Sequence, residues 1–237
     1  MGNTVRQRAT RVAGFFATLL LITFVSLATA QDRDHDWDHD RDRDRDRNHD
    51  RDRDRDHDRD GMFRVSRESV TVDFGGGRGG RPSPDAVCDP GFVAVGFHVQ
   101  TGEFYNEAWL DCAPLRPDGR LGEELRMTSR TGSRGGRPVH DAYCGKGRAL
   151  RGLTGRTGAS IDEAAGECSS VRDIAERYDN PRTELTQTIV RPNPGGRPAD
   201  VQCPAGFVVT GFRSMSGEYM DHLWLICSEL RRSHDDR

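Results

Sequence analysis

Residues 195–227 read GGRPADVQCPAGFVVTGFRSMSGEYMDHLWLIC, and the chain contains this stretch three times in related form. Residues 79–112 read GGRPSPDAVCDPGFVAVGFHVQTGEFYNEAWLDC, and residues 135–168 read GGRPVHDAYCGKGRALRGLTGRTGASIDEAAGEC. Each copy opens with Gly-Gly-Arg-Pro, and its two cysteines are 24 residues apart. A fixed internal period is the signature of a repeat architecture, so these copies decide the fold.

The repeats extend upstream of the glycine pairs. Glu68, Glu124 and Glu184 each precede the pair by 11 residues, which gives units of about 66–116, 122–172 and 182–231. No such unit can bury its apolar face alone, and closure of three units removes exposed sheet edges. We therefore expect a closed, pseudo-threefold β domain over residues 62–231. A β-trefoil is the alternative, but its units are shorter and no Q-x-W signature is present.

Apolar and polar residues alternate with a period of two in residues 69–74, 92–97 and 207–212, which predicts β-strands between glycine and proline turns. One short helix is predicted over residues 169–177, capped by serine. Trp109 and Trp224 occupy equivalent positions three residues before a cysteine, and we expect them to fill the core. Unit two has Ala165 there, which predicts a thinner core in that unit.

The two ends of the chain differ in composition from the repeats. Residues 1–30 combine three early arginines, an apolar run and Ala-Thr-Ala before Gln31, which predicts a cleaved signal peptide rather than a membrane anchor. Residues 31–61 form a low-complexity tail, with 14 Asp, 9 Arg and 4 His in residues 31–60. Such a segment is expected to be a disordered, solvated spacer. Residues 232–237 are a polar C-terminal tail.

These features predict a secreted protein, extracellular or periplasmic, with no membrane span after cleavage. We expect no nucleic-acid partner, because each arginine of the tail has neighbouring aspartates that compete with phosphate.

Six cysteines in an exported chain indicate three disulfides. The equal separations favour pairing within each unit, as Cys88–Cys112, Cys144–Cys168 and Cys203–Cys227. Pairing between neighbouring units is the alternative, and it would make the separations unequal. No cysteine is then left for nucleophilic or redox chemistry, and no spacing of ligands predicts a metal site or a cofactor.

A G-x-x-x-D/N motif precedes the second cysteine of each unit and is the candidate binding site. A carboxylate there can accept hydrogen bonds from two adjacent sugar hydroxyls, glycine lets backbone amides approach, and an aromatic at the middle position can cover the apolar face of a sugar. Unit two has Ser160 at that middle position, and unit one has an amide in place of the carboxylate. The candidate carbohydrate-binding residues are Asp221, Tyr219, Gly217, Asp162, Gly158, Asn106, Phe104 and Gly102.

With a glycine-rich segment at Gly76–Gly80 and the strand ending in S/T-G-x-x-x-D, the chain resembles the jacalin-related lectins. That resemblance implies a β-prism I fold of three four-stranded sheets, and a site for mannose or glucose built from the aspartate and nearby main-chain amides. The Arg-Pro after each glycine pair and the cysteines depart from that family. In its C-P-x-G-F-x-x-x-G-F stretches the chain also resembles the vitelline membrane outer layer proteins, which implies a structural coat or matrix role instead.

Catalysis is not expected, because the chain has no G-x-S-x-G or HExxH motif and the histidines of its units fall at non-equivalent positions. The repeated Arg81, Arg137 and Arg197 are expected to form salt bridges with Glu68, Glu124 and Glu184. The sequence thus favours a secreted, non-catalytic lectin-like protein whose partners are glycans or a cell-surface or matrix polysaccharide. A structural coat or matrix protein without a sugar site is the alternative.

Overall fold

A computed structural model describes residues 62–177, 182–192 and 194–233. The predicted signal peptide and charged tail lie outside the described residues, as do residues 234–237 of the predicted C-terminal tail. Strand β15 continues to Ser233, two residues beyond the expected end of the domain. No helix among the described residues is long and apolar enough to cross a membrane.

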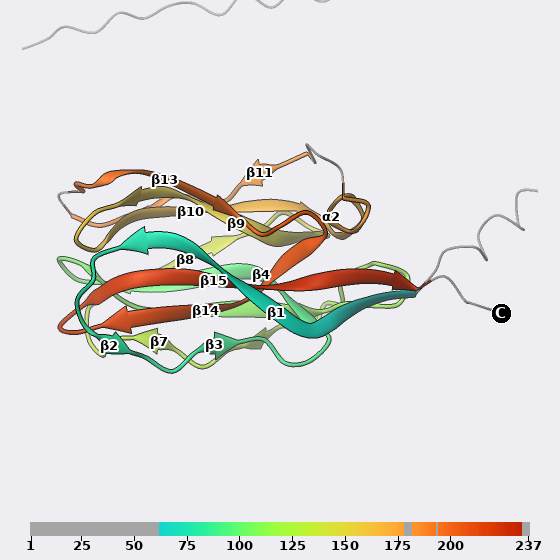
Figure 1. Cartoon of the computed structure of the whole chain (residues 1–237), viewed down its shortest axis with the longest axis horizontal. Helices are drawn as coiled ribbons and strands as arrows, with labels where there is room; N and C mark the ends of the chain where they lie inside the picture. The colour runs from blue at the N-terminus through green and yellow to red at the C-terminus, as the bar shows by residue number, and fades with distance from the viewer. Residues whose placement is uncertain (1–61, 178–181, 193, 234–237) are drawn as a thin grey trace, which may run out of the picture. The chain divides into compact units, whose positions relative to one another are not determined.

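Three antiparallel hairpins, one from each repeat, form the centre of the three sheets (Figure 1). The glycines three and eight residues after the first cysteine explain their local shape. Gly91, like its equivalents, has a positive φ, here of 84°, in the turn that starts the hairpin. A Cβ at Gly96 would lie 3.0 Å from the carbonyl oxygen of Ala142 in the neighbouring strand, so this glycine permits close pairing. The hairpins are β4 (Phe92–Thr101) with β5 (Tyr105–Pro114), β9 (Arg148–Thr157) with β10 (Ile161–Ser170), and β14 (Phe207–Ser216) with β15 (Met220–Ser233).

Each hairpin is completed by strands of the next unit. Strand β4 pairs with β8 (Val139–Tyr143), and β5 pairs with β6 (Arg126–Met127) and β7 (Thr131–Gly132). Strand β9 pairs with β13 (Arg197–Gln202), and β10 pairs with β11 (Glu184–Leu185) and β12 (Ile189–Val190). One sequence repeat therefore contributes to two sheets.

The first unit closes the ring by completing the hairpin of the third. Strand β1 (Met62–Gly76) pairs with β15 from Met62 opposite Ser233 to Gly76 opposite His222. Strands β2 (Arg81–Pro82) and β3 (Ala86–Val87) pair with β14. Figure 1 shows β1 beside β15 although the two strands come from opposite ends of the domain. The predicted all-β, three-repeat β-prism is confirmed by this strand pairing.

All three predicted disulfides are confirmed, as Cys88–Cys112, Cys144–Cys168 and Cys203–Cys227. Each one joins two different sheets. Cys88 follows β3 and donates its amide hydrogen to Thr210 of β14, whereas Cys112 lies on β5. Cys144 and Cys203 are bonded in the same way to Val95 and Arg151, in the sheets of the preceding units. The three disulfides therefore connect the three sheets to one another in a ring.

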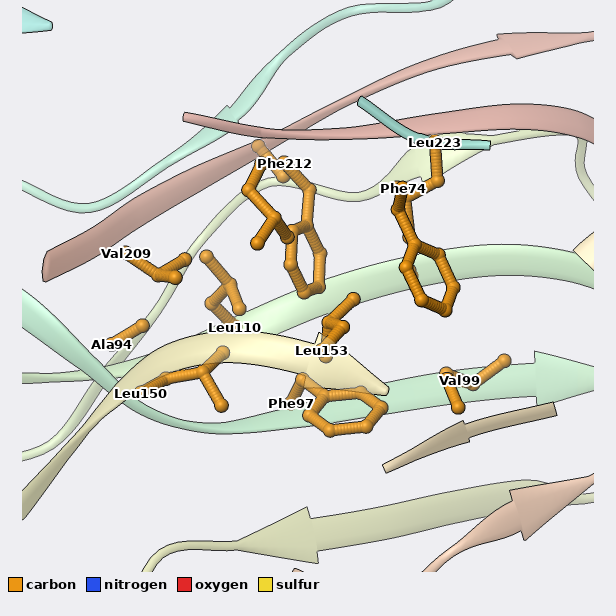
Figure 2. Packing of buried hydrophobic residues seen from close by; sticks show 14 of the residues in the cluster. Phe74, Ala94, Phe97, Val99, Leu110, Leu150, Leu153, Val209, Phe212 and Leu223 are labelled. Carbon is orange, nitrogen blue, oxygen red and sulfur yellow. The ribbon is translucent and has the colours of Figure 1, made fainter. Parts of the chain in front are cut away.

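The main core lies between the three sheets and is built from equivalent positions of the hairpins (Figure 2). Phe97, Leu153 and Phe212 follow the repeated glycine of each unit, and all three are at most 1% exposed. Phe97 and Phe212 meet edge to face, with ring centroids 6.2 Å apart. Unit two has Gly166 where the other units have Leu110 and Leu225, and a Cβ there would lie 2.6 Å from Leu150 and 3.3 Å from Phe97, so neighbouring side chains fill the space.

The two tryptophans lie outside the main core cluster, which corrects the sequence-based expectation, although Trp109 is buried, at 5% exposed. Ala108 and Leu110 of β5 point into the core cluster, so Trp109 between them faces the other side of its sheet, where it stacks on His98 at 5.0 Å. Trp224 stacks on His222 in the same manner, at 4.0 Å. Alternation along a strand assigns opposite faces to neighbouring residues, and the equivalent position in each unit belongs to the outer face.

The predicted helix is a short one, α2 (Val171–Ala175), within the expected 169–177 segment. Its N-cap is Ser170, whose hydroxyl oxygen accepts a hydrogen bond from the amide of Asp173 at 3.1 Å. Val171 and Ile174 of this helix are buried in a second apolar cluster with Val93 and Val208, at the start of the hairpin strands. The helix thus covers the end of the core opposite the hairpin turns.

Candidate functional site

The three G-x-x-x-D/N motifs form the turns of the three hairpins, and their backbones are alike. In each turn the amide of the motif glycine donates a hydrogen bond to the carbonyl oxygen two residues on. These bonds are Gly102 to Phe104 at 2.8 Å, Gly158 to Ser160 at 2.9 Å and Gly217 to Tyr219 at 3.1 Å. The turn of unit one forms without a carboxylate at its end, so the turn does not depend on the aspartate.

A glycine pair from the next unit lies against each turn. A Cβ at Gly80 would lie 2.5 Å from Oδ2 of Asp221, and one at Gly79 would lie 2.8 Å from Oδ1. The same relation holds between Gly196 and Asp162, at 2.5 Å, and between Gly136 and Asn106, at 2.7 Å. Glycine is required here, because any side chain would collide with the motif carboxylate or amide. Each candidate site is therefore assembled from two units.

In unit three no cation of the described residues pairs with the carboxylate of Asp221. Oδ2 of Asp221 accepts a hydrogen bond from the amide of Gly217 at 2.8 Å, and the carbonyl oxygen of Asp221 accepts one from the amide of Gly77 at 2.7 Å. Oδ1 accepts no hydrogen bond from the described residues, and it is not among their fully buried unpaired atoms. One carboxylate oxygen is therefore held in place while the other remains free to accept.

In unit two the carboxylate is already paired. The guanidinium of Arg191 donates to Oδ1 of Asp162, and the side chains are only 15% and 3% exposed. Ser160, at the middle position of this turn, is also buried. The predicted site residues Gly158 and Asp162 thus lie together, but the charge of Asp162 is neutralised by Arg191.

In unit one the amide group is only weakly engaged. The side-chain nitrogen of Asn106 lies 3.5 Å from the hydroxyl oxygen of Ser133, while the amide of Ser133 donates to the carbonyl oxygen of Asn106 at 2.9 Å. Tyr105 before it is buried, and its hydroxyl donates to the carbonyl oxygen of Ile189 at 2.5 Å. Burial raises the pKa of this hydroxyl well above its usual value, so it remains a donor that fixes the turn to the adjacent sheet.

Phe104 and Tyr219, the two aromatic candidates for covering a sugar, contact each other. The rings of Phe104 and Tyr219 stack with centroids 4.3 Å apart and an interplanar angle of 22°. The guanidinium of Arg191 lies 5.1 Å from the ring centroid of Phe104. Both aromatic side chains remain partly exposed. Because Arg191 of unit three also pairs with Asp162 of unit two, side chains from all three units meet at the end of the domain that carries the hairpin turns.

Sequence reasoning missed the position that distinguishes the three sites. Gly77, Ser133 and Arg191 are equivalent, because each donates its backbone amide to the carbonyl oxygen of the last motif residue. In units one and two a single arginine separates this position from the glycine pair, whereas unit three has the three residues 192–194. The two extra residues between this position and the glycine pair of unit three were the signal in the sequence. They place Arg191 beside Asp162, at the position that Gly77 holds beside Asp221.

The expected pairing of the repeated arginines with the repeated glutamates is wrong. Glu68, Glu124 and Glu184 pair instead with Arg231, Arg126 and Arg148, at 3.4, 3.0 and 2.9 Å. The arginines of the Gly-Gly-Arg-Pro segments lie by the turns, whereas these glutamates lie further along the edge strands. Within the described ranges no group of three His, Cys, Asp or Glu residues is placed to hold a metal ion.

No protein-family model and no curated protein matches the sequence. Solved structures of similar fold include a Malaysian banana lectin, at 15% identity and a TM-score of 0.44 over 70% of this chain and all of that one. A mannose-binding jacalin-related lectin from Ananas comosus matches at 14% identity and a TM-score of 0.45, over 68% of this chain and 98% of its own. Artocarpin complexed with methyl-α-mannose matches at 12% identity and a TM-score of 0.46, over 69% and 99%. The identity to these lectins is low, and the β-prism of this chain is defined by its own strand pairing.

Proposed function

We propose that this protein binds carbohydrate through the hairpin turn of unit three, and that it acts without catalysis. The observation that carries the proposal is the state of Asp221, whose Oδ2 is held by the amide of Gly217 while Oδ1 accepts no hydrogen bond from the described residues. The backbone of Gly79 and Gly80 lies against this carboxylate, where a Cβ would come within 2.8 Å and 2.5 Å of its oxygens. A pre-oriented carboxylate next to bare backbone suits two adjacent hydroxyls of a hexose.

Unit three is proposed as the strongest site, because it combines a free carboxylate with an aromatic ring, Tyr219. Unit one has the ring of Phe104 and the amide of Asn106 but no charge. Unit two has Asp162, whose pairing with Arg191 supports a structural role for that carboxylate. The proposal therefore ranks the sites by the availability of the carboxylate and not by the motif alone.

The test is a titration of the full chain with free methyl α-mannoside and methyl α-glucoside, followed by calorimetry or NMR. A hydrogen bond to a charged group contributes about 1.5–3 kcal/mol, so Asp221→Ala is expected to weaken binding by at least about tenfold. Asp221→Asn preserves an acceptor for the turn and should weaken binding without disturbing the fold. Glu218→Gln, in the same turn, is the matched control and should leave the affinity unchanged. In unit one, Asn106→Asp should strengthen binding.

A structural coat or matrix protein is the second candidate function. It is favoured by the internal bonds of the two carboxylates, since Asp221 accepts a hydrogen bond from the amide of Gly217 in its own turn and Asp162 pairs with Arg191. If Asp221→Ala folds normally and binds both glycosides as the wild type does, or if neither protein binds them, the turns are structural and the second candidate replaces the first.

We also propose that the protein is exported after removal of residues 1–30. The support is the sequence of that segment together with three disulfides and no free cysteine in the described residues. N-terminal sequencing of the mature protein should begin at Gln31. A chain that retains Met1 and remains in the producing cell would refute this.

A further inference from the structure

The glycine-rich loops beside the three turns carry exposed arginines that have no carboxylate partner in the part of the chain that the structure describes. Within the described residues no ion pair or hydrogen bond engages their guanidinium groups, whereas Arg126, Arg148 and Arg231 pair with glutamates elsewhere. Long cationic side chains without an internal partner are available to an external anion. These five exposed arginines are Arg78, Arg81, Arg134, Arg137 and Arg197.

The five arginines, which we call the loop arginines, border one end of the domain. Phe104 of unit one stacks on Tyr219 of unit three, and Arg191 lies over Phe104. A Cβ at Gly77 would lie 2.4 Å from the carbonyl oxygen of Ala159, so the loop of unit one also contacts the turn of unit two. The three loops and turns are therefore neighbours at this end of the prism.

The charge of this end is positive although the whole chain has a formal net charge of −3. Its exposed, unpaired acidic side chains in the turns are Glu103 and Glu218, against five loop arginines. Asp162 is neutralised by Arg191, and Asp73 pairs with His222 at 2.6 Å. Even with the carboxylate of Asp221 included, cations are in excess. Such a surface attracts anions, and guanidinium binds carboxylate or sulfate through two parallel hydrogen bonds.

We propose that the ligand is an acidic polysaccharide, whose sugar ring occupies the site at Asp221 and whose sulfate or carboxylate groups are bound by the loop arginines. This inference rests on the proposed function and specifies its substrate class. Two arginines flank that site along the chain: Arg78 directly precedes Gly79, which lies against Oδ1 of Asp221, and Arg81 directly follows Gly80, which lies against Oδ2. Arg137 and Arg197 hold the same place in the other two loops and would bind acidic groups further along the polymer.

The experiment measures binding of the full chain to immobilised polysaccharides in matched charged and neutral pairs. Dextran sulfate is compared with dextran of the same length, and polymannuronate with mannan. The charged member of at least one pair should bind at least about tenfold more tightly at low salt, and the difference should shrink as salt screens the arginines. The pair that shows the difference identifies the acidic group as sulfate or carboxylate.

The variant Arg81→Gln/Arg137→Gln/Arg197→Gln should lose most of this preference, by about tenfold, while its affinity for free methyl glycoside stays unchanged. The matched control is Arg64→Gln/Arg67→Gln/Arg116→Gln, which removes the same charge from exposed arginines toward the other end of the strands and should retain the preference. An Arg→Lys version of the first variant retains charge without the guanidinium fork and should recover only part of the binding.

Several outcomes would overturn the inference. If the charged and neutral polymers bind equally and Asp221→Ala abolishes both, the sugar site stands but the acidic ligand does not. If charged polymers bind while Asp221→Ala changes nothing and free glycosides do not bind, the proposed function fails with it. If single-stranded oligothymidylate binds as tightly as dextran sulfate and depends on the same arginines, the surface is a general polyanion site and not a polysaccharide site.

Discussion

Arg191→Ala should destabilise the domain strongly, because it leaves the carboxylate of Asp162 buried without its cation. The side chain of Asp162 is 3% exposed and that of Arg191 is 15% exposed. Removal of one partner from a buried ion pair costs about 3–5 kcal/mol, since the remaining charge has lost both water and its counterion. Arg191 also covers the ring of Phe104, so packing is lost as well.

This loss converts into a large shift of the melting temperature. For a domain of this size, each kcal/mol lowers Tm by about 2–4 °C, so Arg191→Ala should lower it by about 6–20 °C. The double variant Arg191→Ala/Asp162→Asn should be more stable than Arg191→Ala, because no buried charge remains in it. The backbone bond from residue 191 to the carbonyl oxygen of Asp162 is preserved in both variants.

The assay is thermal and urea unfolding followed by circular dichroism, with Arg213→Ala as the matched control. Arg213 pairs with Asp85 through two hydrogen bonds, but the two side chains are 50% and 32% exposed. An exposed pair contributes only about 0–1 kcal/mol. The reasoning is refuted if Arg191→Ala is no more costly than Arg213→Ala, or if the double variant is no more stable than Arg191→Ala.

Three further predictions concern the disulfides, a buried carboxyl group and the glycine pairs. Replacing both cysteines of any one bridge by alanine should lower the free energy of unfolding by about 3 kcal/mol, because each bridge closes a 24-residue separation, and a bridge whose loss costs nothing in urea unfolding would contradict this. Burial raises the pKa of the Glu167 carboxyl group. The contribution of this group to stability is therefore fully present below its pKa in the unfolded chain, and it is lost as the pH rises through its pKa in the folded protein. Glu167→Gln should therefore raise Tm more at pH 7 than at pH 4, and a gain that is equal at both pH values would exclude this cause. Gly80→Ala should unfold more easily than Gly91→Ala and lose glycoside binding, because both glycines have positive φ but only Gly80 would collide with Asp221, and equal melting temperatures would show that the contact is unimportant.

Local features of the sequence predicted those parts of the fold that depend on local chemistry. Alternating residues and glycine turns identified the hairpin strands, and the serine before the helix was the cap of α2. The equal cysteine separations indicated the disulfide pairing, because a repeat places equivalent cysteines in equivalent geometry. The G-x-x-x-D/N motifs were correctly placed in turns, although their role in binding stays a prediction.

Contacts between distant segments could not be read from the pattern. The period of two does not say which face of β5 lines the main core cluster, so the pattern alone predicts a core position for Trp109, which is instead buried against His98 on the other face. The repeated glutamates were predicted to pair with the repeated arginines only because both recur once in each unit. Side-chain partners are instead set by distances across strands, which placed Arg231 beside Glu68.

The sequence by itself determined three repeats, their strands and their disulfides, because each of these follows from spacing within one unit. Only the tertiary structure decided that every sheet and every candidate site combines two units. Edge strands satisfy their hydrogen bonds with whichever strand the ring brings beside them, and this placed Gly80 of unit one against Asp221 of unit three. The same closure put Arg191 on Asp162 and left Asp221 free, and that difference ranks the three turns as candidate binding sites.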